Sequence, residues 1–290
     1  MTANVPRVVV ITRETGYQRL LATHATRGQA AFFLSSRNQS IDVLETRHQR
    51  FTETLQRIFK HIPSGWRRNH VDRTELDRFL FEPEDLVMAV GQDGLVANVA
   101  KYLDGQRVLG INPDPSLFDG ILVPFSAMAA LRQLVPAMHG DVETQSRVMV
   151  EATLDNGQQL LALNELFLGH RSHQSARYRV DVTTAHEHQS SSGMIVATGT
   201  GATGWARSIN RSRKDALMLP APEDRQLAYY VREAFPSNAT GTSISSGLIT
   251  DQEQIRVRSE MNEGGVIFGD GIEADYLEFN WGEQAGIRVA

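Results

Sequence analysis

The sequence contains no cysteine, and only three of its 290 residues are lysine: Lys60, Lys101 and Lys214. Without cysteine the chain can form no disulfide, no thiolate metal site and no cysteine nucleophile. Arginine supplies the rest of the 29 basic residues. A site for an anion would therefore depend on arginine, backbone amides, a metal ion or helix ends rather than on clustered lysines.

Long apolar runs and a net positive charge are also missing. No stretch approaches the roughly 18–20 apolar residues of a transmembrane helix, and residues 1–7 do not resemble a signal peptide. The formal net charge of −5 argues against a general electrostatic affinity for nucleic acid. We therefore expect a cytoplasmic protein that binds neither membrane nor nucleic acid.

The composition is typical of a globular protein, with 41% hydrophobic and 22% charged residues over a length that suits two domains. In residues 1–124, short apolar runs alternate with amphipathic segments, which predicts an α/β domain with a parallel sheet. The predicted strands are residues 7–12, 30–34, 86–90 and 108–111. The predicted helices are residues 17–31, 41–62 and 98–103.

Residues 125–290 follow a different pattern, which predicts a mainly β domain. Ser126 is a candidate N-cap for a helix reaching residue 138. A hairpin turn is expected at residues 155–157, where the sequence reads Asp-Asn-Gly. The predicted strands are residues 147–154, 159–167, 177–184, 194–198, 227–232, 255–258, 265–268 and 276–279. The last strand segment is a candidate for packing back on the first domain.

The first candidate site directly follows the apolar run of residues 86–90. Gly91, Gln92, Asp93 and Gly94 occupy the end of that predicted strand, the position where open α/β sheets bind ligands. Glycines allow backbone amides to approach a phosphate closely, and an aspartate between them suits a general base or a magnesium-linked role. A plain glycine turn with a helix-capping aspartate would give the same sequence.

The second candidate is the polar pair Asn164 and Glu165, which interrupts an otherwise apolar strand. A glutamate can accept hydrogen bonds from vicinal hydroxyls, and an asparagine can donate or accept them. A strand end that reaches solvent is the alternative interpretation.

The third candidate is a loop rich in glycine and threonine after the apolar run of residues 194–197. It offers amides and hydroxyls to a polar ligand, and its tryptophan is able to stack on a base or to pack in the core. Its residues are Thr198, Gly199, Thr200, Gly201, Ala202, Thr203, Gly204 and Trp205.

Other signals are weaker. Four of the nine histidines fall at positions 170, 173, 186 and 188, but His186 and His188 lie in a polar segment expected to be a loop, without a convincing set of metal ligands. We therefore assign no metal ligand. A P-loop, a Rossmann glycine motif after the first strand and a Gly-x-Ser-x-Gly elbow are all missing from the sequence.

The order of these motifs resembles the NAD kinase family, within the superfamily of diacylglycerol kinases and phosphofructokinases. The family pattern reads Gly-Gly-Asp-Gly-Thr, Gly-Ile-Asn, Asn-Glu and Thr-Pro-Thr-Gly-Ser-Thr-Ala-Tyr. Here the corresponding segments begin at Gly91, Gly110, Asn164 and Thr198, and a Gly-Asp-Gly turn at residues 269–271 matches more loosely.

The resemblance implies a two-domain enzyme, with its site in the cleft, that phosphorylates the 2′-hydroxyl of the adenosine ribose of NAD. ATP or polyphosphate is the donor, and Mg²⁺ accompanies it. Asp93 would be the general base, and Asn164 and Glu165 would hold the ribose hydroxyls of the acceptor. Phosphate or nucleotide binding is assigned to Gly91, Gln92, Gly94 and Asn112. Acceptor binding is further assigned to Thr198, Gly199, Thr200, Gly201, Ala202, Thr203 and Trp205. A homo-oligomer is expected.

Several positions depart from the family pattern. Gln92 replaces a glycine, Leu95 replaces a threonine, and residues 113–120 after Asn112 differ from the usual Gly-x-Leu-Gly-Phe. Ser192 stands where the family has an aspartate that contacts the nucleotide. A kinase for another polyol, a sugar or a nucleoside, and a non-catalytic nucleotide-binding protein, are therefore the alternative functions. A lipid kinase is disfavoured, since no basic amphipathic surface helix is evident.

Overall fold

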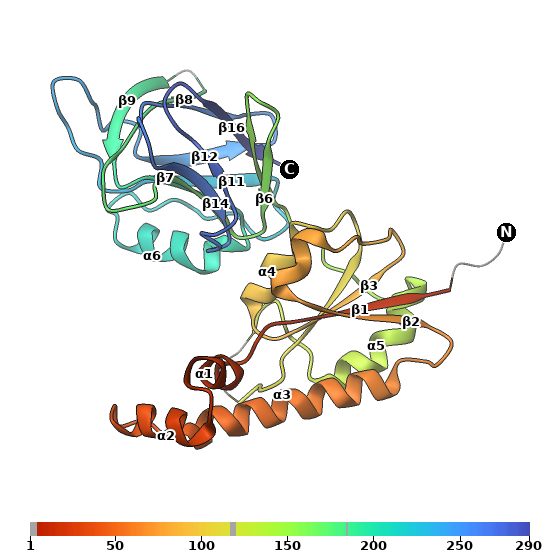
Figure 1. The fold of residues 1–290 in the computed structure, drawn as a ribbon. Coiled ribbons are helices and arrows are strands. Elements are labelled where there is room, and N and C mark those ends of the chain that lie inside the picture. The colour runs from red at the N-terminus through yellow and green to blue at the C-terminus, as the bar shows by residue number, and fades with distance from the viewer. Residues whose placement is uncertain (1–4, 117–119, 184) are drawn as a thin grey trace. The chain divides into compact units, whose positions relative to one another are not determined.

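The computed structural model describes residues 5–116, 120–183 and 185–290 (Figure 1). The chain divides into two compact units, residues 1–144 and residues 145–290. The sequence analysis placed this boundary after residue 124. The first unit extends further because helix α5 (Ala127–His139) packs against α3 (Ile41–His61) and against strand β4 (Arg107–Ile111).

The first unit is built on a parallel sheet of four strands in the order β2-β1-β3-β4, which confirms the predicted α/β class. The other three strands are β1 (Arg7–Thr12), β2 (Arg67–Asp72) and β3 (Leu86–Val90). The sequence analysis missed β2 because it is an edge strand whose first four residues are exposed and polar, so no apolar pattern marks it.

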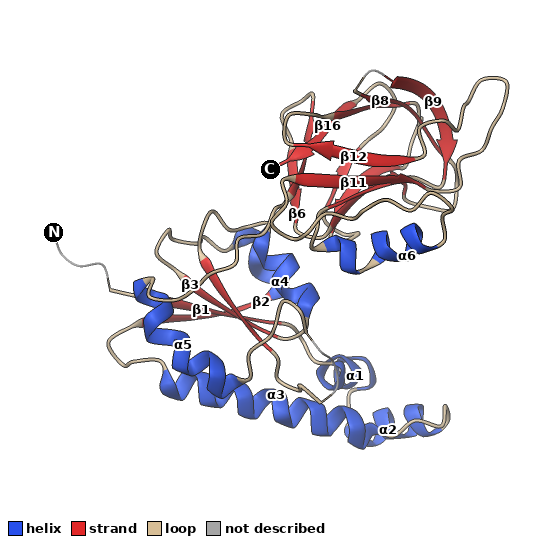
Figure 2. Ribbon diagram, turned by 180° about the vertical axis from the view of Figure 1, so that it is seen from behind, coloured by secondary structure: helices blue, strands red, loops and turns tan. Residues whose placement is uncertain are grey.

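Helices cover both faces of this sheet (Figure 1). On one face, Ile58 of α3 and Leu134 of α5 pack with Val10 and Met88 in a buried apolar cluster. Helix α4 (Asp93–Ala100) lies on the opposite face (Figure 2). It begins at Asp93, five residues before the expected residue 98 and directly after Gly91 and Gln92. Asp93 and Gly94 of the first candidate site are therefore its first two residues.

Residues 13–40 form two short helices, α1 (Gly16–His24) and α2 (Arg27–Ser35), instead of one helix and a strand. Ala25 ends α1 with a positive φ of 60°, and the Thr26 hydroxyl begins α2 by accepting the amide of Gln29 at 3.2 Å. The predicted strand at residues 30–34 is wrong. Ala30 and Leu34 are four residues apart, so a helix places both on the same face, where they join Ile41 in one apolar cluster.

The second unit contains two six-stranded sheets, as its β-rich sequence predicted. Their strand orders are β12-β11-β10-β7-β14-β15 and β6-β5-β16-β13-β8-β9, with antiparallel pairing throughout. The strands are β5 (Val150–Leu154), β6 (Gln159–Ala162), β7 (Glu165–His170), β8 (Ala176–Val182), β9 (Ala185–Ser191), β10 (Met194–Ala197), β11 (Gln226–Val231), β12 (Ser246–Thr250), β13 (Ile255–Ser259), β14 (Gly265–Gly269), β15 (Tyr276–Glu278) and β16 (Gln284–Val289).

One buried cluster joins the two sheets, with Leu166 and Val196 from one and Tyr178 and Ile255 from the other. The hairpin expected at residues 155–157 connects β5 and β6. The last predicted strand, residues 276–279, corresponds to β15, which pairs with β14. β12 and β16 were not predicted; β12 pairs with β11, and β16 pairs with β5 and β13. The short helix α6 (Trp205–Arg211) follows the glycine-threonine loop and packs against β11.

Two strand predictions in this unit need correction. The strand expected over residues 159–167 is broken into β6 and β7 by a bend at residues 163–164. The polar segment with His186 and His188 is strand β9, not a loop. It pairs along its whole length with β8, so backbone pairing holds it where its side chains give no apolar signal.

Candidate active site

The Gly-Gln-Asp-Gly motif lies where β3 ends and α4 begins. The Gly91 amide donates to the Ile111 carbonyl at 2.9 Å, which ties the turn to the neighbouring strand β4. Gln92 is the N-cap of α4, but its side chain makes no capping bond, and Asp93 and Gly94 form the first turn. The motif therefore sits at the carboxyl end of a parallel sheet, where α/β proteins bind ligands.

The carboxylate of Asp93 is held by two backbone amides of a distant loop. One oxygen, Oδ1, accepts the Leu122 amide at 2.7 Å, and Oδ2 accepts the Ile121 amide at 3.2 Å. Asp93 is half-buried. An ionised carboxylate offers about four lone-pair positions, so two remain for a substrate hydroxyl. The side chain is thus oriented without losing its capacity to accept a proton.

The loop that supplies these amides passes very close to Gly110 in β4. A side-chain carbon on Gly110 would lie 1.8 Å from the Leu122 carbonyl oxygen, so only glycine allows the backbone to approach this closely. The Gly110-Ile111-Asn112 segment, which the sequence analysis noted as a motif, thereby sets the place of the amides that hold Asp93.

Asn112 is buried, and its side-chain oxygen accepts the Asp114 amide at 2.9 Å. Arg50 of α3 pairs with the Asp114 carboxylate at 2.8 Å. These contacts give Asn112 a part in shaping the loop, and its expected contact with phosphate stays a prediction. Residues 117–119 of the unusual segment after Asn112 lie outside the described residues.

In the second unit, Asn164 lies in the bend between β6 and β7, and Glu165 directly follows it. Glu165 is the first residue of β7 and pairs with Ala197 of β10. Burial, and then the nearby Asp270 carboxylate, raise the pKa of Glu165 to about 7. Perturbed carboxylates of this kind are common at functional sites. The sequence analysis selected both residues of the bend but did not select Asp270, whose only signal was the Gly-Asp-Gly turn.

Thr198 anchors the glycine-threonine loop to this bend. Its hydroxyl donates to the Leu163 carbonyl at 2.6 Å and accepts the amides of Thr200 and Gly201 at 3.1 and 3.2 Å. Thr198 is fully buried. Its hydroxyl therefore folds the loop, while the expectation that it borders the acceptor is untested.

The glycines of this loop allow close backbone packing. A side-chain carbon on Gly199 would lie 1.9 Å from the Ala221 carbonyl oxygen, and one on Gly201 would lie 2.1 Å from that of Asn164. Thr200 is buried and accepts a hydrogen bond from Arg147 at 3.2 Å, and Ala202 is also buried. The loop is thus pressed against the Asn164 bend, and its high glycine content has a structural cause.

Thr203, Gly204 and Trp205 are the exposed members of the loop. Trp205 is 38% exposed, stacks on Phe167 at 6.2 Å between ring centres, and lies under the Arg232 guanidinium at 5.1 Å. Thr203 borders a shallow hollow of about 400 Å³ on α6. The other lining residues are Gly204, Arg207, Ser208, Arg211 and Ser212.

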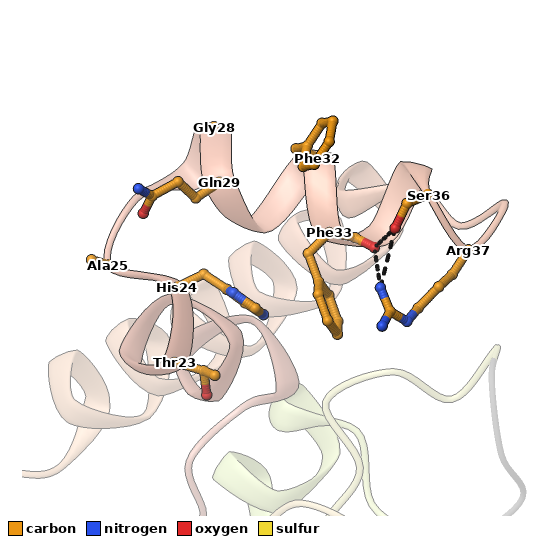
Figure 3. Close-up of a pocket in the computed structure, with 9 residues that line it drawn as sticks. All are labelled: Thr23, His24, Ala25, Gly28, Gln29, Phe32, Phe33, Ser36 and Arg37. Carbon is orange, nitrogen blue, oxygen red and sulfur yellow. Dashed lines mark hydrogen bonds between the residues drawn. The ribbon is translucent and has the colours of Figure 1, made fainter.

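A second hollow, of about 670 Å³, lies on the helical hairpin of α1 and α2 (Figure 3). Phe33 of α2 is one of its lining residues, and the Arg37 guanidinium lies 3.8 Å from the centre of the Phe33 ring. None of the predicted site residues lines it. Among the described residues, no group of three or more His, Asp or Glu side chains could hold a metal ion, and no helix is long and apolar enough to cross a membrane.

Comparison with known proteins gives matches to NAD kinases, although no protein-family model matches the chain. The rat protein named NAD kinase 2, mitochondrial, is 27% identical over 262 residues, which cover 73% of this chain and 62% of that protein. The NAD kinase of a Marinomonas species is 32% identical over 148 residues, covering 47% of this chain and 49% of that protein. The chain thus spans less than two thirds of the length of these relatives.

Solved structures share the fold. An NAD kinase from Archaeoglobus fulgidus in complex with ATP superposes with a TM-score of 0.59 at 18% identity, covering 98% of this chain and 90% of that chain. A yeast NADH kinase complexed with NADH gives a TM-score of 0.61 at 14% identity, covering 99% and 81%. The chain is thus similar to NAD kinases in sequence, as a divergent relative, and it shares their fold.

Proposed function

We propose that the chain transfers the terminal phosphoryl group of ATP to a ribose hydroxyl of NAD, giving NADP and ADP. The observation that carries this proposal is the Asp93 carboxylate, which two backbone amides orient at the carboxyl end of β3. A general base must be held in place and must still be able to accept a proton, and Asp93 meets both requirements. It would take the proton of the acceptor hydroxyl as that oxygen attacks phosphorus.

The acceptor would be recognised in the second unit. Asn164 and Glu165 are consecutive residues that supply an amide and a carboxylate, a pair of groups that suits two neighbouring hydroxyls. In its ionised form, Glu165 accepts a hydrogen bond from one of them. Trp205 supplies a partly exposed aromatic surface for a base, and the amides of the Thr198–Thr203 loop are candidates for polar contacts with the adenosine end.

The phosphates of the donor would lie near the β3–α4 turn. Gly94 has open space around it, Gln92 is exposed between Gly91 and Asp93, and Asn112 follows the adjacent strand. The names of the relatives and the ATP and NADH complexes of the structural neighbours support this choice of substrates. We propose that Mg²⁺ arrives as part of MgATP, since metal ions in such sites are held largely by phosphate and water. A cytoplasmic homo-oligomer stays our expectation.

The test is an assay of the pure protein with NAD and either MgATP or polyphosphate, with NADP formation as the readout. NADP from either donor supports the proposal. If neither donor gives NADP while ATP is consumed with a sugar or nucleoside, the chain is a kinase for another acceptor, consistent with the loss of the family aspartate at Ser192. If nucleotides bind and no acceptor is phosphorylated, the chain is a nucleotide-binding protein without activity.

A further inference from the structure

The bend that carries Asn164 and Glu165 is held by a residue 106 positions further along the chain. Asp270 directly follows β14 and has a positive φ of 54°. Its Oδ1 accepts the Asn164 amide at 2.7 Å, its Oδ2 accepts the Leu163 amide at 2.9 Å, and its own amide donates to the Glu165 carbonyl at 3.0 Å. Resting on the function proposed above, we propose that Asp270 is a positioning residue for the acceptor, fixing the backbone from which Asn164 and Glu165 reach it.

The turn itself does not require an aspartate. Glycine adopts a positive φ at lower cost than any other residue, and the chain places glycines on both sides of Asp270. What an aspartate adds is a pair of acceptor oxygens for two neighbouring amides that face the same way. An asparagine would offer one acceptor, and its NH₂ group would then oppose the second amide. The choice of aspartate is therefore explained by the bend it holds.

The same bend is also fixed from β10. The Thr198 amide donates to the Asn164 carbonyl at 2.9 Å, and the Thr198 hydroxyl donates to the Leu163 carbonyl. Leu163 and Asn164 thus each donate their backbone amide to Asp270 and accept a hydrogen bond from Thr198 at their carbonyl. A site that must hold two hydroxyls at fixed spacing benefits from such rigid support.

The charge of Asp270 adds a property that a purely structural clamp would not have. Among the described residues, Asp270 is the charged group that affects the pKa of the Glu165 carboxyl. On strand β10, the residue paired with Glu165 is Ala197, which carries no charge. Burial and this charge keep the pKa of Glu165 near 7. Because the ionised form accepts the ligand hydroxyl, acceptor binding should weaken as the pH falls through this range. Removing the Asp270 charge should move that weakening to lower pH.

The experiment compares Asp270→Asn with the wild type in steady-state kinetics for NAD from about pH 5.5 to about pH 8.5, a range that brackets the raised pKa. We expect KM for NAD to rise about tenfold while kcat changes by less than about twofold, as for a loss of binding common to ground and transition states. The midpoint of the pH dependence of 1/KM should shift to lower pH. Glu273→Gln, which removes an exposed acid three residues away, should leave both quantities unchanged.

A pH midpoint and KM unaltered by Asp270→Asn, in a wild-type enzyme that makes NADP, would overturn the inference and leave the proposed function intact. A wild-type protein that makes no NADP would instead refute the function. If Asp270→Asn does not fold, Asp270→Gly is measured instead, because glycine accepts the positive φ but has neither acceptor oxygen. A raised KM for NAD with a pH midpoint shifted to lower pH supports the inference, and wild-type values of both overturn it.

Discussion

The two units place carboxylates in opposite surroundings. In the first unit, the Asp93 oxygens accept backbone amides of a loop that comes from the same parallel α/β layer. In the second unit, Glu165 faces another carboxylate, Asp270, at a bend inside a β sandwich. Asp93 thus receives hydrogen bonds that favour a carboxylate, whereas burial and the charge of Asp270 disfavour the ionised form of Glu165.

This difference is consistent with the separate roles that we propose for Asp93 and Glu165. A base that must accept a proton during turnover benefits from fixed orientation, and loop amides provide it without a competing charge. A recognition residue can tolerate a shifted pKa, because it binds a neutral hydroxyl rather than reacting with it. The following predictions test this comparison, beginning with the largest expected effect.

Replacing Asp93 tests whether this residue is the general base. Asp93→Asn keeps one acceptor oxygen but removes the basic site, so kcat should fall by about 10²–10⁴ while the protein still folds and binds ATP. NADP formation and equilibrium binding of ATP measure the two properties. Asp104→Asn, which removes an exposed acid from the same unit, should behave as wild type. Normal turnover by Asp93→Asn would remove Asp93 from the mechanism.

A substitution at Gly110 tests whether the amides that hold Asp93 must be precisely placed. In Gly110→Ala the new carbon meets the Leu122 carbonyl oxygen at 1.8 Å, so the backbone has to move. Overpacking of this kind costs about 1–3 kcal/mol. Urea unfolding should report the lost stability, and kcat should fall with it. Gly28→Ala has open space around it in α2 and should be neutral or slightly stabilising.

The substitution Glu165→Gln tests whether burial and the Asp270 charge disfavour the ionised form of Glu165, with the free energy of unfolding as the measured quantity. Because the folded state raises the pKa of Glu165 above its usual 4.5, that state holds the proton more tightly than the unfolded chain. The stabilisation is complete below about pH 4.5 and is lost as the pH rises through about 7, up to about 3 kcal/mol in total. Glu165→Gln should remove this slope and be more stable than wild type at pH 8, whereas Glu273→Gln should retain it. If the free energy of unfolding changed with pH in the same way in wild type and in Glu165→Gln, the pKa of Glu165 would not be raised in the folded state.

The smallest effect is expected at Trp205. Its stacking on Phe167 is worth about 0.5–1.5 kcal/mol, so Trp205→Leu should lower stability slightly. If the exposed part of the ring also stacks on a base, KM for NAD should rise more than stability falls. Trp281→Leu, at a 64% exposed tryptophan, is the matched control. An unchanged KM would assign Trp205 to packing alone.

The sequence predicted correctly those elements whose residues form one continuous pattern along the chain. The strand before Gly91, the helix of residues 41–62 and the hairpin at residues 155–157 each have a continuous pattern, and all three were predicted. β2 and β9 were missed because their polar side chains leave only backbone pairing to define them. Asp270 was missed as a site residue for a related reason, since its partners Leu163 and Asn164 are more than a hundred positions away.

The loop between β4 and α5 is closed at its base. The Asn112 amide donates to the Phe125 carbonyl at 2.8 Å, the Phe125 amide donates to the Gly110 carbonyl at 3.3 Å, and Ile111 bridges to Phe125. The cost of closing a loop grows only slowly with its length. A change in the length of this loop should therefore be tolerated wherever it leaves the closing bonds and the Ile121 and Leu122 amides in place, because those amides hold Asp93.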